Sequence, residues 1–147
     1  MLVGWGGNNG STLTAGIMAN RQNLSWRTKQ GEMSANYYGS FTQCSATKVG
    51  VKVDQDNKFS EVHKTIKDLV PLVNPNDLVV TGWDISDLNL YESCLRAKVL
   101  EPTLLEQLKS QLSEMKPMKS AFTPQFIASN QADRATNVLT GTNQEVI

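Results

Sequence analysis

A run of glycines near the start of the chain constrains its fold more than any other feature. The run GWGGNNG spans residues 4–10 and lies between the apolar residues 1–3 and residues 11–22, which suit a helix. Glycines let the backbone turn tightly and approach a pyrophosphate, and the N-terminus of a following helix offers free N–H groups and a positive dipole end. The run therefore predicts a strand, a turn and a helix that together bind a dinucleotide. The alternative is a tight turn without a ligand.

The spacing of this run departs from the usual G-x-G-x-x-G pattern. Counted from Gly4, the pattern requires glycines at positions 4, 6 and 9, but position 9 is Asn9 and the last glycine of the run is Gly10. Asn8 and Asn9 tolerate left-handed backbone conformations and add side-chain donors. A Walker A phosphate loop is excluded, because no lysine precedes Ser11.

The rest of the chain alternates between strand and helix patterns. Residues 47–53 alternate apolar and polar and, with residues 58–62, predict a hairpin. Residues 78–80 predict a short buried strand, and residues 23–46 are polar and irregular. Further expected elements are a helix at 63–73, a helix from Pro102 to Pro117, a weak strand at 120–122 and helical turns in 125–134. Another helix is expected from a Ser86 or Asp87 cap to about Val99, and its apolar face would contain Leu88, Tyr91, Leu95 and Val99. This alternation predicts an α/β layer with a parallel sheet and an inserted β-hairpin.

An acidic residue that follows a strand is expected to bind the adenosine ribose of the dinucleotide. Glu32 stands at the usual distance from the glycine run, but no strand pattern precedes it. Asp84 follows an apolar run, at the strand end where ligands bind in such sheets. We therefore favour Asp84, with residues 23–73 as an insertion. Alternatively, Asp84 caps the helix that follows it, and both roles are compatible.

Composition and charge exclude several other classes of protein. The chain has 147 residues, which is the size of one domain. Its 14 basic and 14 acidic residues give no net charge, and this balance argues against binding to nucleic acid or to a membrane surface. It has neither an apolar run long enough to span a bilayer nor a signal-peptide pattern. Its two cysteines lack metal-site spacing, so we expect a cytoplasmic protein without a metal centre. Only three residues precede the glycine turn, so we expect a fragment of a longer chain.

Several blocks of sequence resemble the eukaryotic-type myo-inositol-1-phosphate synthase family. They follow one order along nearly the whole chain, and several are long and unusual. The blocks are GWGGNNGST at 4–12, ANYYGS at 35–40, GWDIS at 82–86, LNL at 88–90, RAKVL at 96–100, and FIA at 126–128 followed by NQ at 130–131. The resemblance is therefore more specific than the glycine run alone.

The resemblance implies a set of cofactor-binding residues. Residues of this chain match the family's pyrophosphate loop, its ribose acid, and contacts at the end of the next strand and in the segment after it. They are Gly6, Gly7, Asn8 and Asn9 for the loop, Asp84 for the ribose, and Ser120, Ala121, Gln131 and Arg134 for the remaining contacts. Ala121 is expected to act through its backbone. The family's catalytic lysines lie beyond residue 147, so Lys98 and Lys119 are not assigned that role.

The resemblance also implies a fold and an activity. The expected fold is an incomplete Rossmann-like NAD-binding domain over residues 1–147, with a parallel sheet, helices on both faces and an inserted hairpin. The family's enzymes are cytoplasmic homotetramers that convert D-glucose 6-phosphate to 1D-myo-inositol 3-phosphate for inositol phospholipid synthesis, with tightly bound NAD that is reduced and reoxidised. The alternative is a stand-alone, non-catalytic dinucleotide-binding module, and a different NAD-dependent dehydrogenase is a third possibility.

Overall fold

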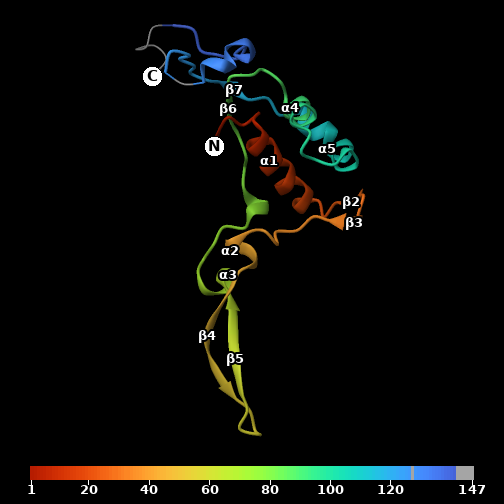
Figure 1. The fold of residues 1–147 in the computed structure, drawn as a ribbon, viewed down its shortest axis with the longest axis vertical. Helices are drawn as coiled ribbons and strands as arrows, with labels where there is room; N and C mark the ends of the chain where they lie inside the picture. Colours follow the sequence, from red (N-terminus) through yellow and green to blue (C-terminus); the bar gives the residue numbers. More distant parts are fainter. Residues whose placement is uncertain (127, 142–147) are drawn as a thin grey trace. The chain divides into compact units, whose positions relative to one another are not determined.

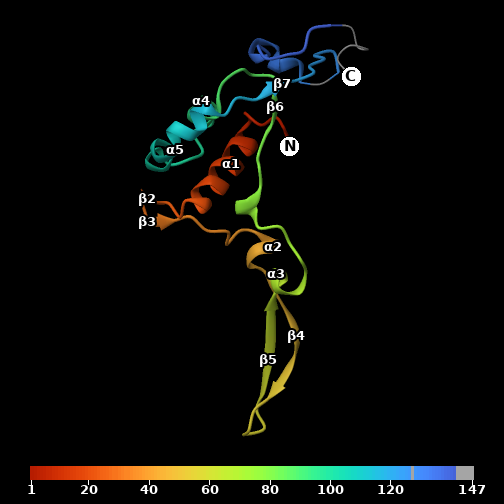
Figure 2. The same cartoon turned by 180° about the vertical axis from the view of Figure 1, so that it is seen from behind.

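The computed structural model describes residues 1–126 and 128–141 of the chain (Figures 1 and 2). The chain divides into two compact units. Met1–Ala35 and Val79–Ile147 form the first unit, and Asn36–Leu78 form the second. Residue 127, inside the predicted helical turns at 125–134, lies outside the described residues.

A three-stranded parallel sheet organises the first unit (Figure 1). Its strand order is β1 (Leu2–Val3), β6 (Gly82–Asp84) and β7 (Met118–Lys119). Since all three strands run the same way, their carboxyl ends meet at one edge of the sheet. The glycine turn, Asp84 and Ser120 lie at or just beyond these ends, as expected for a ligand site in a parallel sheet.

Three helices bury most of the apolar core of this unit. The helices α1 (Asn8–Arg21), α4 (Leu90–Ala97) and α5 (Pro102–Glu114) contact one another, and both views show them together (Figures 1 and 2). These three helices form one layer, so a helical layer on the other face of the sheet stays a prediction. The buried apolar residues are Trp5, Ala15, Ile17, Met18, Ala19, Leu90, Cys94, Leu104, Leu105, Leu108 and Leu112.

The parallel sheet and its helices confirm the predicted α/β fold. The predicted helix from Pro102 is also confirmed, including its apolar face. None of the helices in the described part of the chain combines the length and apolar character needed to span a membrane.

The predicted position of α4 was wrong at both its start and its buried face. Asn89, rather than Ser86 or Asp87, caps the helix: its side chain accepts a hydrogen bond from Glu92 N, and Glu92 completes a capping box. The buried residues of α4 are Leu90, Ser93 and Cys94. Two members of the predicted face are half exposed, Leu95 at 49% and Val99 at 56%.

Residues 23–46 are more regular than predicted. β2 (Ser25–Thr28) and β3 (Gly31–Ser34) form an antiparallel hairpin, and α2 (Phe41–Cys44) follows in the second unit. Contacts distant in sequence stabilise the hairpin, because two side chains of α5 bind its backbone. Thr103 Oγ1 donates to Arg27 O at 3.0 Å, and Gln107 Nε2 donates to Ser25 O at 3.0 Å.

The strands of the parallel sheet lie at slightly different positions from those predicted. Residues 78–80 were expected to form a buried strand, but Val79 is 90% exposed and β6 begins at Gly82. The register explains the shift, since the short β1 pairs Leu2 with Gly82 and Val3 with Trp83. Similarly, the strand expected at 120–122 is β7 at Met118–Lys119.

The second unit contains the predicted inserted hairpin. β4 (Ala46–Val53) and β5 (Phe59–Thr65) pair antiparallel, which confirms the hairpin at 47–62. The helix expected at 63–73 is shorter, because residues 63–65 continue β5 and only Ile66–Leu69 form the helix α3. One further 3-10 turn, η1 (Pro75–Asp77), closes the unit.

Candidate functional site

The glycine turn connects the end of β1 to the start of α1. Gly4 has φ +72°, a left-handed conformation that glycine adopts without strain. Its N–H donates to Trp83 O at 2.9 Å, and its carbonyl accepts from Gly7 N at 2.9 Å. A Cβ on Gly10 would stand 2.5 Å from Trp5 O, so the helix can approach the turn this closely only with glycine at that position.

The N-terminus of α1 is open toward an anion. The helix begins at Asn8, three residues earlier than the sequence pattern indicated, and its cap residue Gly7 has no side chain to bond the first-turn amides. The first N–H groups of a helix have no intrahelical acceptor, and the helix dipole places a partial positive charge there. The first turn contains no acidic residue. Asn8 and Asn9 are exposed, so their amides are accessible to a phosphate.

Asp84 ends β6 and is almost completely buried, at 3% exposure. Its Oδ1 accepts a hydrogen bond from Ser86 N at 2.9 Å and faces Arg134 Nη2 at 3.5 Å. Its Oδ2 faces the glycine turn, 3.4 Å from the position that a Cβ on Gly6 would occupy. The alternative role for Asp84 was wrong, since Asn89 caps α4.

The segment after β7 brings two more predicted residues to the same place. It contains η2 (Ser129–Arg134) and is fixed to the sheet by Asn137, whose N–H donates to Ile85 O at 2.8 Å and whose Nδ2 donates to Asp84 O at 3.0 Å. Arg134 Nη1 donates to Gln131 Oε1 at 2.9 Å. Arg134 Nε is buried and has no hydrogen-bond partner within residues 1–126 and 128–141.

One pocket of about 670 Å³ lies at this edge of the sheet. The volume falls in the range of small-molecule sites, roughly 300–1,000 Å³. Six of the nine predicted site residues line it: Gly7, Asp84, Ser120, Ala121, Gln131 and Arg134. Gly6, Asn8 and Asn9 are not part of its lining, but they belong to the same turn and helix start. The structure thus places all the predicted residues at one edge of the sheet.

Sequence reasoning missed two side chains of α4 that contact the glycine turn. Arg96 Nη2 donates to Gly6 O at 2.7 Å. Burial lowers the pKa of the Arg96 guanidinium from its ordinary value, and Arg134 lowers it further, whereas Asp84 raises it. Ser93 is fully buried, and its Oγ lies 3.1 Å from the position of a Cβ on Gly6. Arg96 lies in one of the resemblance blocks, but nothing in its local pattern indicates a contact 90 residues away.

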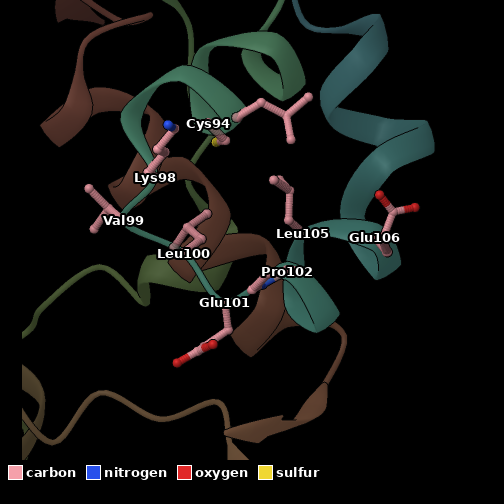
Figure 3. Close-up of a pocket in the computed structure, with 9 residues that line it drawn as sticks. Cys94, Lys98, Val99, Leu100, Glu101, Pro102, Leu105 and Glu106 are labelled. Carbon is pink, nitrogen blue, oxygen red and sulfur yellow. The ribbon is translucent and has the colours of Figure 1, made fainter.

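A second, smaller pocket of about 360 Å³ lies between α4 and α5 (Figure 3). Cys94, Lys98 and Leu105 are among its lining residues, and it includes none of the predicted site residues. It is therefore separate from the candidate site.

The residues present fit a dinucleotide. A Cβ on Gly10 would collide with the backbone of the turn, and one on Gly6 would be crowded by Ser93 and Asp84. An open helix N-terminus follows, and a buried carboxylate ends the next strand of the parallel sheet. Together these features define a dinucleotide-binding α/β domain.

The comparisons with known proteins specify the family. A family model for the NAD-binding region, described as myo-inositol-1-phosphate synthase, matches residues 1–147. The chain belongs to this family, and its cofactor is NAD.

The chain covers a limited part of the relatives it matches. Inositol-3-phosphate synthase 1 of Oryza sativa subsp. japonica is 49% identical over 147 residues, which are 100% of this chain and 28% of the relative. Inositol-3-phosphate synthase 1-B of Xenopus laevis is 51% identical over 147 residues, 25% of its length. A crystal structure of inositol-3-phosphate synthase from Caenorhabditis elegans matches with a TM-score of 0.90 and 48% identity, over 99% of this chain and 28% of that one.

Proposed function

We propose that the complete protein is an inositol-3-phosphate synthase and that this chain supplies much of its NAD site. The proposed reaction is the isomerisation of D-glucose 6-phosphate to 1D-myo-inositol 3-phosphate. The observation that carries the proposal is the clustering of Asp84, Ser120, Gln131 and Arg134 in one pocket beside the glycine turn, in a chain that matches synthases along its whole length.

Asp84 is the proposed ribose acceptor. Its Oδ1 is engaged by Ser86 N and Arg134, so Oδ2, which faces the glycine turn, is the oxygen that would accept the ribose hydroxyls. A 2′-phosphate at this position would face a carboxylate and be repelled by it. The geometry therefore favours NAD over its 2′-phosphorylated form.

The pyrophosphate is proposed to bind at the start of α1. Gly6 and Gly7 allow the close approach of the backbone, and the amides of Asn8 and Asn9 would donate to the phosphate oxygens. Bound NAD supplies a reversible hydride acceptor, which makes an internal oxidation and reduction possible.

The other wall of the pocket is proposed to complete the cofactor site. Ser120 is 9% exposed and held by backbone bonds to Asn137 and Leu139, so it is a rigid part of the wall. Ala121 would contribute backbone groups. Gln131 and Arg134 would donate from η2, with Arg134 Nε as the donor that has no partner in the described part of the chain. From the family resemblance, we further propose that the complete enzyme is a cytoplasmic homotetramer.

The test is an assay of the complete subunit with D-glucose 6-phosphate and NAD, with inositol phosphate as the measured product. We expect product from the wild type and a large loss for Asp84→Ala. Lys98→Ala and Lys119→Ala are the matched controls and should keep wild-type turnover, because the catalytic lysines are expected beyond residue 147. A protein that binds NAD and forms no inositol phosphate would instead support the non-catalytic module. Product formed by residues 1–147 alone would contradict the division of roles.

A further inference from the structure

Arg96 belongs to a different element of the fold from the glycine turn, and its side chain contacts that turn. It lies in the last turn of α4, and its Nη2 donates to the carbonyl of Gly6 at 2.7 Å. This short, charge-assisted bond joins residues that are 90 positions apart. Although Arg96 is exposed overall, this end of its side chain is fixed on the glycine turn.

The bond restrains one peptide group from both of its sides. The carbonyl of Gly6 and the N–H of Gly7 belong to the same planar peptide unit. The N–H donates to Gly4 O at 2.9 Å, while the carbonyl accepts from Arg96. Glycine residues on both sides leave this peptide with more rotational freedom than any other residue type would. Two hydrogen bonds at opposite ends remove that freedom.

The restrained peptide immediately precedes the start of α1. Gly7 is the cap residue, and its carbonyl accepts from Ser11 N at 3.0 Å, so its orientation sets the direction of the first helical amides. Ser93, one turn before Arg96 on α4, packs under Gly6 with its Oγ 3.1 Å from the position of a Cβ there. The helix α4 therefore contacts the glycine turn at two points.

We propose that Arg96 is a positioning residue for the cofactor's pyrophosphate. Its guanidinium orients the Gly6–Gly7 peptide and thereby the backbone amides of Asn8 and Asn9. The guanidinium also places a positive charge beside the glycine turn. This inference rests on the proposed placement of NAD. It assigns to α4, which carries none of the predicted site residues, a part in binding the cofactor.

The consequence is selective for the phosphate part of the ligand. Removing the guanidinium frees the Gly6 carbonyl and lets the peptide rotate, so the amides lose their alignment on the pyrophosphate. Adenosine has no phosphate and depends on the ribose and adenine contacts, which involve Asp84 and the opposite wall of the pocket. A purely structural role for Arg96 would instead weaken every ligand by the same factor.

The experiment compares affinities for NAD, ADP and adenosine in the complete subunit, measured by titration calorimetry for the wild type and for Arg96→Gln. We expect NAD and ADP to bind about tenfold more weakly to the variant, the contribution of a hydrogen bond to a charged group, with adenosine changed less than twofold. Lys98→Gln is the matched control, since it removes one positive charge two residues away, and we expect it to bind all three ligands as the wild type does.

Arg96→Lys gives a second measurement that does not depend on the folding of the Gln variant. It keeps the charge but shortens the side chain, so NAD affinity should fall less than in Arg96→Gln, again with adenosine unchanged. Unchanged NAD affinity in both variants, or an equal loss for NAD and adenosine, would overturn the inference. A wild type that does not bind NAD would contradict the proposed cofactor site itself, so the two failures are distinguishable.

Discussion

Substituting Gly10 by alanine separates the steric demand of the glycine turn from the general effect of glycine in a helix. A Cβ on Gly10 would lie 2.5 Å from Trp5 O and 2.9 Å from Gly4 O, whereas real Cβ contacts are essentially never shorter than 3.0 Å. The turn must therefore move by about 0.5 Å, and the atoms that move are backbone. Overpacking of this kind costs about 1–3 kcal/mol.

Gly16 provides the matched control in the same helix. A Cβ there has nothing within 4 Å, so Gly16→Ala should show only the helix-propensity gain of up to about 1 kcal/mol. Both variants share this gain, and the difference between them isolates the clash at about 1–3 kcal/mol. Thermal or denaturant unfolding of the purified protein measures the difference.

The same pair of variants tests the link from the turn to the cofactor. Displacing Gly4 O disturbs the bond that it accepts from Gly7 N, so Gly10→Ala should also lower NAD affinity by at least about fivefold, while Gly16→Ala should not. Equal stability and equal NAD affinity for the two variants would refute the steric reasoning.

Four further predictions concern the core, a helix cap and the two thiols. Leu108→Ala should lower the free energy of unfolding by about 2–5 kcal/mol in denaturant titrations, because Leu108 is fully buried among the three helices; a loss under about 1 kcal/mol would contradict that packing. Asn89→Ala should cost about 1 kcal/mol of stability by removing the cap of α4, and an unchanged free energy of unfolding in the same assay would contradict that cap. Cys44 is exposed and Cys94 is buried, so a thiol reagent should modify one thiol quickly and the second only on unfolding. Burial raises the pKa of Cys94, with a smaller opposing effect of Ser11. The stability that the protonated Cys94 thiol contributes is therefore full below the unfolded-state pKa and is lost as the pH rises through the folded-state pKa. Unfolding scans on the alkaline side of pH 9 should show this loss, and Cys94→Ser should reduce it.

The parts of the site that depend on local chemistry could be predicted from the sequence. A glycine run before a helix pattern predicts a tight turn, and an acid after an apolar run is expected at the end of a strand; the structure places Gly7 and Asp84 in one pocket. The helix α5 could also be predicted, because Pro102 marks the start of the helix and regularly spaced leucines mark its buried face.

Other features depend on contacts that the local sequence does not record. The start of α4 is an exception that the sequence does record, because Glu92 follows Asn89 at the spacing of a capping box, whereas neither Ser86 nor Asp87 has such a partner. The β2–β3 hairpin is polar, so its pattern resembles a loop until α5 supplies donors to its backbone. The contact of Arg96 with Gly6 arises from the packing of α4 against the glycine turn, and no spacing along the chain encodes it.

The most direct test of the proposed cofactor site is a fluorescence titration of the complete subunit with NAD and with its 2′-phosphorylated form, for the wild type and for Asp84→Ala. Trp5 in the glycine turn and Trp83 beside Asp84 act as reporters. We expect saturable quenching by NAD in the wild type, weaker binding of the phosphorylated cofactor, and a loss of NAD affinity of about tenfold or more in the variant, as expected for a charged hydrogen-bond acceptor. Wild-type NAD affinity in Asp84→Ala would contradict the proposal that Asp84 binds the ribose.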